Sequence, residues 1–469
     1  MLLTNDKSQN AHPAAPPAPT RIVVLGGGFG GAHAARHLER LFRNRPDVEI
    51  VLVSRDNFFL VTPLLFEVCS DELEVRHCSQ PIRAFLRRAR FIEATVQHVD
   101  LDRRVVHASS AEGERYELAY DQLVLALGAA TNQRLIPGSE IAFTFKTVAD
   151  ALTLRNHVIE RFERADTESD PDRKRRLVTF VVIGGGLVGT ELTGELTVLV
   201  DEILRYYPRV RREEVQFHII EAGERILPEM RADLASYAAR VLRGRGVNVH
   251  VATPVQSVEP GRLHLAAETI EAETIVLAAG IVPSGVVAGL DVEKDKSGRM
   301  VVDATMRCPS RPELWALGDA ARIPGPDGKP YPALAQHALR EAKTVARNIH
   351  AVLHGGAPEP FVYETLGTMA SLGHYRAIGV IAGVPLKGFP AWWAWRSYYL
   401  MQMPRWSRRV RIMIDWTVAL FFRPDITKVD LAVEQMLHRR NCAAGAAEGR
   451  RSALGPRLSA EAFVRNTPA

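Results

Sequence analysis

Cysteine is scarce in this chain of 469 residues, and its four cysteines are scattered: Cys69, Cys78, Cys308 and Cys442. They form no C-x-x-C pair and no metal-ligand spacing, so the sequence predicts neither a disulfide framework nor a zinc site. The 15 histidines form no ligand-spaced cluster, and we expect no bound metal. This cysteine usage is typical of a reducing compartment.

Long apolar runs and a strong net charge are also lacking. No stretch offers the roughly 18 uninterrupted apolar residues that a membrane-spanning helix needs. Residues 1–20 run from a polar start into Ala/Pro-rich sequence without the apolar core of a secretory signal, and we expect them to form a disordered leader. The net charge of +5 is modest for this length and argues against nucleic acid as a partner.

One pattern occurs twice in the chain. Each copy has a β-rich run, a glycine loop, a helical stretch and a second strand, and ends with an apolar strand that runs into glycine. The first copy extends from Gly26 to Gly128 and the second from Gly184 to Gly280. Because a strand, a glycine loop, a helix and a strand make a βαβ unit, the sequence predicts an α/β protein with two Rossmann-like dinucleotide-binding domains.

Both glycine loops match the pattern G-x-G-x-x-G. In such a loop the first glycine allows a tight turn, the second lets backbone N–H groups approach a pyrophosphate, and the third lets the helix pack on the strand. The helix dipole then favours the bound anion. A single copy could mark only a tight turn, but here each loop follows a β-branched strand and precedes a helix. The matching glycines are Gly26, Gly28 and Gly31 in the first loop and Gly184, Gly186 and Gly189 in the second.

The two copies differ at the end of the second strand. Glu221 ends this strand in the second copy, where a carboxylate accepts hydrogen bonds from a ribose 2′-hydroxyl and repels a 2′-phosphate. This favours NADH over NADPH, and the alternative is a solvated strand-end acid. The first copy has Ser54 and Arg55 at this place, where an acid would be usual.

The remaining segments suggest the domain limits. A charged break at 165–176 is expected to be an exposed loop, and short alternating runs at 103–107 and 262–265 to be antiparallel strands. A strand at 313–317 follows both copies, and we place it back in the first domain, which makes the second an insertion. The predicted domains are an FAD-binding domain at 21–150 and 295–365, an NAD(H)-binding domain at 151–294, a C-terminal region at 366–435 and a mobile tail at 440–469.

Aromatic and basic residues gather in segment 387–423. It holds ten of the chain's 33 aromatic residues, five of its six tryptophans, and seven basic residues against one acid. Two apolar stripes have helical spacing: one runs through Trp392, Trp395 and Tyr399, and the other through Ile412, Trp416, Ala419 and Phe422. Arginines interleaved with aromatic residues are typical of an amphipathic pair of helices at an anionic bilayer surface. The alternatives are core packing or packing in a homodimer.

The two glycine loops and the segment Trp315-Ala-Leu-Gly-Asp319 resemble the flavoproteins with two dinucleotide-binding domains. The resemblance implies that Asp319 contacts the ribityl chain of FAD, with a helix N-cap as the structural alternative. Segments 59–68 and 331–338 are similar to type II NADH:quinone oxidoreductases, and this likeness covers about residues 20–430. It implies that Pro63 and Leu64 face the flavin, and that Ala335 and Gln336 face a quinone.

The resemblance assigns two further residues. Glu195 matches the family's glutamate near the nicotinamide and the proton path, and Lys146 lies in a segment similar to the link into the second domain. The chain departs from the family pattern at Arg340, where glutamine often occurs. The predicted catalytic residues are Glu195 and Gln336, and the predicted cofactor-binding residues are Gly26, Gly28, Gly31, Ser54, Arg55, Pro63, Leu64, Gly128, Asp319, Ala335, Gln336, Gly184, Gly186, Gly189, Glu221 and Gly280.

The implied activity is transfer of a hydride from NADH to FAD and of two electrons to a membrane quinone, without proton pumping. The protein would lie peripherally on the cytoplasmic face of the cell membrane, held through residues 387–423. Three alternatives stay open. A sulfide:quinone oxidoreductase would need paired redox cysteines beside the flavin, a soluble reductase would need an acidic protein acceptor, and a flavin-dependent sensor would lack quinone turnover.

Overall fold

The computed structural model describes residues 19–365, 367–403, 405–422 and 426–428. The chain divides into two units, residues 1–426 and 427–469, and the description concerns the first. The predicted tail at 440–469 lies outside the described residues, as do most of the predicted leader, residues 366 and 429–435 of the predicted C-terminal region, and residues 404 and 423 of segment 387–423.

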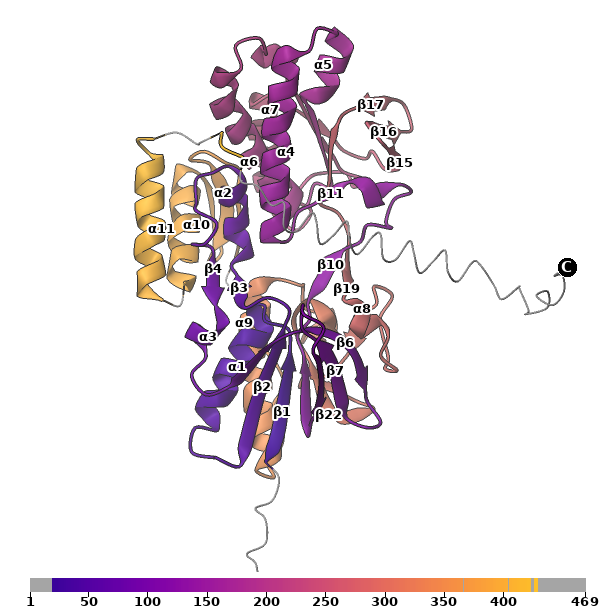
Figure 1. The fold of residues 1–469 in the computed structure, drawn as a ribbon, viewed down its shortest axis with the longest axis vertical. Coiled ribbons are helices and arrows are strands. Elements are labelled where there is room, and N and C mark those ends of the chain that lie inside the picture. Colours follow the sequence, from indigo (N-terminus) through magenta and orange to yellow (C-terminus); the bar gives the residue numbers. More distant parts are fainter. Residues whose placement is uncertain (1–18, 366, 404, 423–425, 429–469) are drawn as a thin grey trace, which may run out of the picture. The chain divides into compact units, whose positions relative to one another are not determined.

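The first half is built on a sheet of six strands in the order β21-β22-β9-β1-β2-β5. All neighbours are parallel except β21 and β22. Figure 1 shows α1 beside β1 and β2, and α1 packs against α9. The bounds are β1 (Thr20–Leu25), α1 (Phe29–Leu41), β2 (Val48–Ser54), β5 (Arg90–Glu93), β9 (Gln122–Leu125), β21 (Arg307–Cys308), β22 (Arg311–Ala316) and α9 (Ala335–Leu353).

The second half repeats this architecture with five parallel strands in the order β11-β18-β12-β13-β14. The helix that follows its glycine loop, α6, is buried over almost its whole length. The bounds are β11 (Phe143–Thr144), α4 (Val148–Thr167), α5 (Pro171–Leu177), β12 (Thr179–Ile183), α6 (Leu187–Ile203), β13 (Gln216–Ile220), α7 (Ala232–Gly244), β14 (Val247–His250) and β18 (Thr274–Leu277).

Strand register places the two glycine loops equivalently. Leu25, the last residue of β1, pairs with Val53 of β2 and Leu125 of β9. Ile183 ends β12 and pairs with Ile220 of β13 and Leu277 of β18. Because carboxyl ends of parallel strands meet at one edge of a sheet, each loop opens at the edge where an α/β protein binds its ligand.

The second half is inserted in the first. β22 follows it in the sequence and pairs in parallel with β9 of the first sheet, as predicted for the strand at 313–317. Strands β10 (Ala129–Thr131) and β19 (Ile281–Pro283) pair with each other where the chain leaves the first half and returns. The predicted antiparallel strands are present as β7 (Val105–Ser109), between β6 (Thr95–Asp100) and β8 (Arg115–Ala119), and β16 (Arg262–Leu265), between β15 (Val255–Glu259) and β17 (Thr269–Glu271).

The prediction of an exposed loop at 165–176 is wrong. Helix α4 continues to Thr167 and α5 begins at Pro171, so most of the charged segment is helical. The sequence does contain a local signal for the start of a helix. The Asp170 side chain accepts hydrogen bonds from the N–H groups of residues 172 and 173, and Pro171 occupies the first helical position. Three basic residues in the last turn complement the helix dipole.

The C-terminal region has an antiparallel sheet followed by two helices. Helix α10 packs on the sheet, and α10 and α11 lie side by side (Figure 1). Among the described residues, no helix is long and apolar enough to cross a membrane. The bounds are β24 (Gly367–Ser371), β25 (Ala377–Ile381), β26 (Val384–Gly388), α10 (Phe389–Gln402) and α11 (Trp406–Ala419).

A short helical segment of the first half packs against the second half. Helix α2 contacts both α4 and α6. The surrounding elements are β3 (Phe58–Leu60), the 3-10 turn η1 (Thr62–Leu64), α2 (Leu65–Cys69), β4 (Ser79–Pro81) and α3 (Ile82–Phe85).

Candidate functional site

The first glycine loop has the geometry of a pyrophosphate cradle. Gly26 has φ +103°, and a Cβ atom on Gly31 would lie 1.9 Å from the Gly26 carbonyl oxygen. Only glycine fits either place. A Cβ on Gly28 would meet nothing within 4 Å, and no side chain caps α1. The N–H groups at this helix N-terminus are therefore available to an anion.

The second loop has the same geometry. Gly184 has φ +108°, and a Cβ on Gly189 would lie 1.8 Å from the Gly184 carbonyl oxygen. Gly186 precedes α6, whose N-terminus also lacks a side-chain cap. The six glycines thus form two cradles, each between a parallel strand and a helix.

Glu221 is held in place by both of its carboxylate oxygens. Oε2 accepts a hydrogen bond from the N–H of Gly185 at 2.7 Å, and Oε1 accepts one from the N–H of Gly223, also at 2.7 Å. Two donors from the glycine loop and the strand-end turn fix the carboxylate beside the cradle. It is therefore a built feature of the second site rather than a freely solvated acid.

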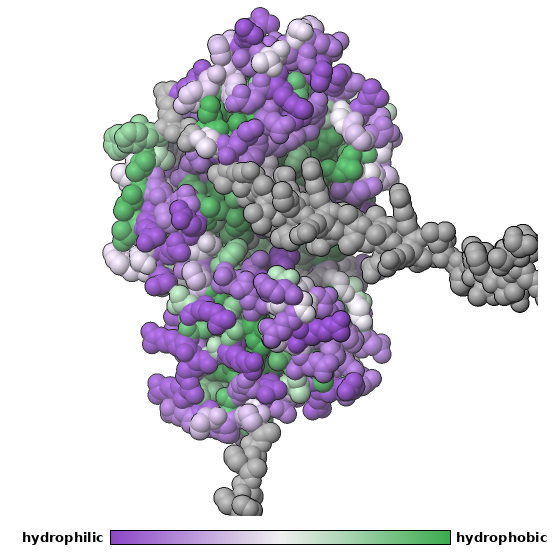
Figure 2. All heavy atoms as spheres, viewed as in Figure 1, coloured by the Kyte–Doolittle hydropathy of each residue, from purple (hydrophilic) through white to green (hydrophobic). Residues whose placement is uncertain are grey.

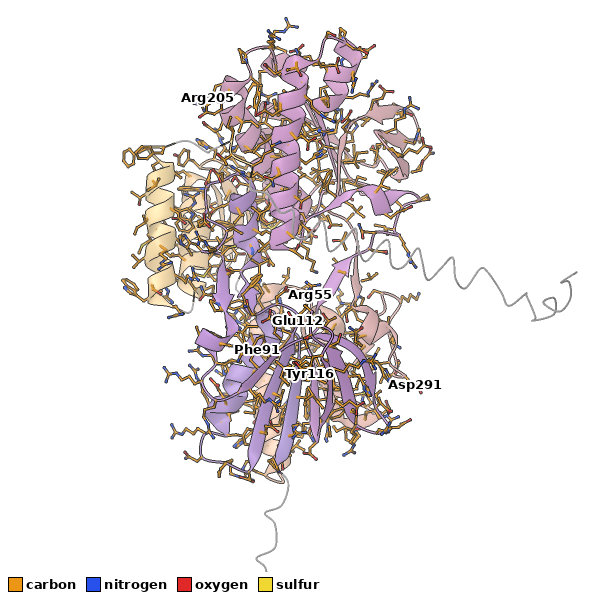
Figure 3. The ribbon with its side chains drawn as sticks, in the orientation of Figure 1. Arg55, Phe91, Glu112, Tyr116, Arg205 and Asp291 are labelled. Atoms are coloured by element: carbon orange, nitrogen blue, oxygen red, sulfur yellow. The ribbon has the colours of Figure 1, made fainter. Side chains whose placement is uncertain are left out.

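The equivalent place in the first half is filled differently. Ser54 is buried, and its Oγ would lie 2.5 Å from a Cβ atom on Gly27, so the hydroxyl packs directly on the loop. Arg55 is exposed and pairs with Asp56 at 3.2 Å. Figure 3 labels Arg55 at the edge of the first sheet. The structure places Ser54 against the cradle and Arg55 on the surface beside it.

Asp319 lies in a 3-10 turn, η5 (Gly318–Ala320), directly after β22. Its Oδ2 is 3.6 Å from the Lys146 ammonium, and Glu341 accepts a hydrogen bond from the Gly318 N–H at 2.7 Å. Burial and then the nearby Asp319 raise the pKa of Glu341 to about 7. The next helix starts only at Ala335, so the N-cap alternative for Asp319 is wrong.

The predicted flavin and quinone segments have defined partners. Pro63 and Leu64 form the turn η1, in which Leu64 is fully buried. Gln336, in the first turn of α9, donates from Nε2 to the carbonyl oxygen of Gly367 at 3.0 Å and accepts from the Tyr363 hydroxyl at 3.3 Å. Ala335 has no polar side-chain group, so of these two residues only Gln336 can form side-chain hydrogen bonds.

Arg340 extends this network rather than breaking it. It donates to the Gln336 carbonyl oxygen at 3.0 Å and lies over the Tyr363 ring at 4.9 Å. The closing glycines Gly128 and Gly280 both have positive φ, +65° and +69°. They precede the paired strands β10 and β19, which join the two halves.

Glu195 lies on the side of α6 that faces α2 and β24. It is buried, its Oε1 accepts a hydrogen bond from the Ser371 hydroxyl at 3.1 Å, and its Oε2 has no hydrogen-bond partner. Burial and then the carboxylates of Glu72 and Glu67 raise its pKa to about 8. In the described structure no hydrogen bond joins Glu195 to Gln336, the other predicted catalytic residue.

Several residues near Glu195 were not predicted as site residues. Glu191, one turn earlier on α6, accepts the Ser371 N–H at 2.8 Å. Glu67 is 2.9 Å from Arg396 Nε and accepts the Trp416 indole N–H at 2.7 Å. The sequence carries one signal for Glu67, which is a single acid inside an apolar run, where a charge is expensive to bury.

The apolar stripes of the C-terminal segment face inward except at the end of the second one. Trp395 and Ile412 are fully buried, and Arg396 lies between the rings of Trp392 and Trp416, at 4.2 and 4.7 Å. This part of the predicted stripes is therefore core, whereas Phe422, the last residue of the second stripe, is exposed. The exposed apolar residues of α10, α11 and the turns beside them are Phe389, Trp393, Met401, Trp406, Met413, Ile414, Val418, Leu420, Phe421 and Phe422.

The three cysteines that the structure describes do not form a redox pair. Within the described part of the chain, Cys69, Cys78 and Cys308 are all buried and free. Burial raises the pKa of the Cys69 and Cys78 thiols to about 12, which keeps them protonated and unreactive. This argues against the sulfide:quinone oxidoreductase alternative.

Comparison with known proteins agrees with this arrangement. Residues 20–342 match the pyridine nucleotide-disulphide oxidoreductase family, and residues 365–425 match the NDH2 C-terminal domain. The chain is similar in fold to the structure of NDH2 from Plasmodium falciparum in complex with NADH, with a TM-score of 0.80 and 20% identity over 87% of this chain and 100% of that one.

Curated relatives are more similar in sequence. Type II NADH:quinone oxidoreductase Ndh of Mycobacterium tuberculosis is 31% identical, covering 95% of this chain and 98% of its own. An internal alternative NAD(P)H-ubiquinone oxidoreductase of Arabidopsis thaliana is 32% identical over 87% of this chain and 86% of its own. The chain therefore belongs to the type II NADH:quinone oxidoreductase family of FAD-dependent NADH dehydrogenases.

Proposed function

We propose that this chain takes a hydride from NADH held in the second half and delivers two electrons to a quinone through FAD held in the first half. The observation that carries the proposal is the pair of glycine cradles, of which only the second has a fixed carboxylate, Glu221, beside it. Family membership and the NADH-bound fold relative support this assignment.

The residues of each cradle fit their dinucleotide. In the first half, Gly26, Gly28 and Gly31 would hold the FAD pyrophosphate, and Asp319 would bind the ribityl chain from its turn after β22. When bound, FAD supplies the chemistry that accepts a hydride and passes on two electrons. Glu341 holds this turn through the Gly318 N–H, and Lys146 adds a positive charge beside Asp319.

In the second half, Gly184, Gly186 and Gly189 would hold the NADH pyrophosphate. The Glu221 carboxylate would accept hydrogen bonds from the adenosine ribose hydroxyls and repel the 2′-phosphate of NADPH. Its two backbone donors hold the carboxylate in one orientation.

The acceptor site is proposed at the start of α9. Gln336 would contact the quinone head group, and its hydrogen bonds to Gly367 and Tyr363 hold its amide in one orientation. Pro63 and Leu64 would cover the flavin from η1. Arg340 packs on Tyr363 and so supports Gln336 from the next turn of the helix.

The quinone would be reached at a bilayer surface. The exposed apolar residues of α10, α11 and their flanking turns form one set that includes Trp393, Trp406 and Phe421, which are 63%, 71% and 77% exposed. Figure 2 shows hydrophobic side chains along the edge of the molecule formed by α11. Arg405 and Arg411 are exposed next to them. Apolar side chains flanked by arginines suit an anionic membrane, and we propose the cytoplasmic face.

Rapid mixing tests the redox assignment. The FAD-loaded protein is mixed anaerobically with NADH or NADPH, and bleaching of the flavin absorbance is recorded before a short-chain quinone is added. We expect fast bleaching by NADH, slow bleaching by NADPH, and fast recovery with quinone. Bleaching by NADH with no recovery would contradict a quinone acceptor and favour the soluble reductase or the sensor.

Vesicle flotation tests the membrane surface. A Trp406→Ser, Phe421→Ser double variant should bind vesicles that contain phosphatidylglycerol about 100-fold more weakly, because each large side chain contributes about 1.5–3 kcal/mol when buried. Added salt should weaken wild-type binding. Val362→Ser is the matched control, since Val362 is exposed outside this segment. If the double variant binds like the wild type but loses a dimer on a sizing column, the surface is a homodimer interface.

A further inference from the structure

A cavity of about 680 Å³ lies where the second half meets the C-terminal region. Its walls come from the end of α6, the residue after α7, the turn between β24 and β25, and the start of α10. The volume falls within the range of about 300–1,000 Å³ that small-molecule sites occupy. We call it the α6–α10 cavity; the residues that line it include Asp201, Glu202, Arg245, Tyr375, Arg376 and Phe389, and none of those proposed for the two cradles or the acceptor site.

One rim of the α6–α10 cavity is basic. Arg240 and Lys387 lie 6.0 and 5.7 Å from the centre of the Tyr237 ring, and Arg376 donates to the Tyr237 hydroxyl at 3.5 Å. A Cβ atom on Gly388, which lines the cavity, would lie 3.3 Å from the same hydroxyl. The three cations are exposed, and within the described residues none of them forms an ion pair with a carboxylate. Because like charges held around one ring repel each other, this rim favours a bound anion, and a phosphate has the oxygens to bind several cations at once.

The α6 side of the cavity is acidic. Asp201 accepts a hydrogen bond from Arg212 at 2.7 Å through Oδ1, and Glu202 binds Arg205, which Figure 3 labels, through Oε2. The second oxygen of each carboxylate accepts no hydrogen bond from the described residues, so it can accept one from a ligand. The Tyr375 ring lines the same cavity. Carboxylates beside an aromatic ring suit a primary ammonium, which donates hydrogen bonds to the oxygens and is attracted to the ring face.

A strained turn fixes the aromatic wall of the cavity. Gly373, His374 and Tyr375 have positive φ angles of +73°, +32° and +61°, a conformation that is costly for the two residues with a side chain. The Arg245 guanidinium holds the turn by donating to three of its carbonyl oxygens, those of residues 372, 373 and 374. The Tyr375 ring then packs edge-on against Trp392, with ring centres 5.0 Å apart. The wall is therefore built by defined contacts with α10.

The cavity opens beside the exposed apolar residues of α10. Phe389, the first residue of the helix, lines the cavity and is exposed, and its ring lies 5.5 Å from that of Trp392. Trp393, also exposed, belongs to the proposed membrane surface. A ligand whose polar head fills the cavity can therefore extend apolar chains along this surface.

We infer that the α6–α10 cavity binds the head group of a phospholipid that carries both a phosphate and a primary ammonium, as phosphatidylethanolamine does. The cations around Tyr237 hold the phosphate, and the two acids of α6 hold the ammonium. A head group with negative charge alone would face Asp201 and Glu202 without a donor for them, and a choline head has no N–H to donate. The inference rests on the membrane surface of the proposed function, and it adds a site that selects lipids by head group rather than by net charge.

Calorimetry with short-chain lipids, kept below the concentration at which they form micelles, tests this site away from any bilayer. The FAD-loaded full chain is titrated with dihexanoyl phosphatidylethanolamine, phosphatidylcholine and phosphatidylglycerol. We expect the ethanolamine lipid to bind at least about 10-fold more tightly than the other two, because it alone donates charged hydrogen bonds to the acids of α6. Equal binding of the three lipids, or no binding of any, overturns the inference.

Variants separate the two ends of the head group. Arg376→Gln should weaken binding of all three lipids about 10-fold, because they share the phosphate. The Asp201→Asn, Glu202→Gln double variant should weaken only the ethanolamine lipid and remove its preference. Arg43→Gln and Glu112→Gln, at exposed places in the first half, are the matched controls and should change neither. Flavin bleaching by NADH checks that each variant is folded. A preference for ethanolamine that survives in the double variant overturns the inference.

The head group without its chains separates a lipid from a soluble ligand. Glycerophosphoethanolamine has the same phosphate and ammonium, and it should bind at least about 10-fold more weakly than the short-chain lipid, because it buries no apolar chain against Phe389 and Trp393. If it binds as tightly as the lipid, the occupant is a soluble phosphate ester and the lipid assignment is wrong.

Vesicle flotation distinguishes failure of this site from failure of the proposed function. The Trp406→Ser, Phe421→Ser variant should bind vesicles weakly and still bind the short-chain ethanolamine lipid. If the wild type floats with vesicles but binds no short-chain lipid, the head-group site is wrong and the membrane surface stands. If the Trp406→Ser, Phe421→Ser variant floats like the wild type while the short-chain lipid binds, the proposed membrane surface is wrong and the head-group site stands.

Discussion

The two dinucleotide-binding halves share a glycine loop and differ in the side chain that the end of the second strand places against it. In the second half the loop N–H of Gly185 donates to the Glu221 carboxylate, whereas in the first half Gly27 packs against the hydroxyl of Ser54. The loops themselves have similar φ angles at their first glycine and the same close contact at their third. The comparison teaches that the loop provides a general pyrophosphate cradle, and it supports the proposal that the end of the second strand selects the dinucleotide.

The helices that follow the loops differ as well. Helix α1 packs on α9 within its own half, and its one buried acid, Glu39, accepts backbone N–H groups from residues 87 and 88 at 2.9 Å. Helix α6 also contacts α2 and β24 from other parts of the chain, and its buried acids Glu191 and Glu195 share a serine. The buried acids of α6 are therefore bonded to another part of the chain, β24, whereas Glu39 of α1 is bonded within its own half.

The largest expected effect comes from substituting the third glycine of each loop, because each substitution should disable one dinucleotide site and leave the other intact. Gly31→Val should abolish FAD binding, and Gly189→Val should leave FAD bound but abolish reduction by NADH. Each added side chain would overlap a backbone oxygen, so we expect a loss of more than about 4 kcal/mol, roughly 1000-fold in affinity. Flavin absorbance and NADH bleaching measure the two outcomes. Gly244→Ala, whose Cβ meets nothing within 4 Å, is the control, and loss of flavin from both valine variants would contradict two independent sites.

The next effect concerns the acids of α6. Their raised pKa values mean that stability is fully present below the usual glutamate pKa and is lost as the pH rises through about 8. The Glu191→Gln, Glu195→Gln double variant should flatten this decline, on the order of a few kcal/mol, because glutamine does not ionise. Unfolding by urea at several pH values measures it. A decline as steep as in the wild type would show that these acids ionise freely in the fold.

A smaller effect is expected at the strand ends. Glu221→Ser places in the second half the residue type that the first half has as Ser54. It should weaken NADH binding about 10- to 100-fold, because that is the contribution of a hydrogen bond to a charged group. NADPH binding should improve relative to NADH, since the repelling charge is gone. The ratio of the two rates of flavin bleaching checks this. An unchanged ratio would mean that Glu221 does not select the dinucleotide.

The smallest effect is expected at Arg55, on the surface beside the first loop. Its pair with Asp56 is exposed, so Arg55→Ala should change the free energy of unfolding by less than about 1 kcal/mol. FAD retention during dialysis tests the proposed role of Arg55 in cofactor binding, and we expect a weakening of about 1 kcal/mol. If FAD is retained as in the wild type, the first half holds its dinucleotide without Arg55.

The repeated fold and its inserted second half could be predicted because their signals are local. Glycine at Gly26 and Gly184, a β-branched strand before each loop and an acid at Glu221 specify backbone conformation and chemistry within a few residues. The wrong prediction of a loop at 165–176 also has a local cause. The many charged residues of this segment indicated a solvated loop, although Asp170 and Pro171 are a local signal for a helix start. The boundaries at 150/151 and 294/295 and the roles of the predicted site residues stay predictions.

The sequence by itself determined the two cradles and the strand that returns to the first sheet, because φ angles, helix starts and strand patterns depend on neighbouring residues. Only the tertiary structure decided which face of α10 and α11 is buried, and that Glu67, Glu195 and Arg396 meet. These residues are more than 100 positions apart, and burial and electrostatic balance depend on what the folded chain brings into contact.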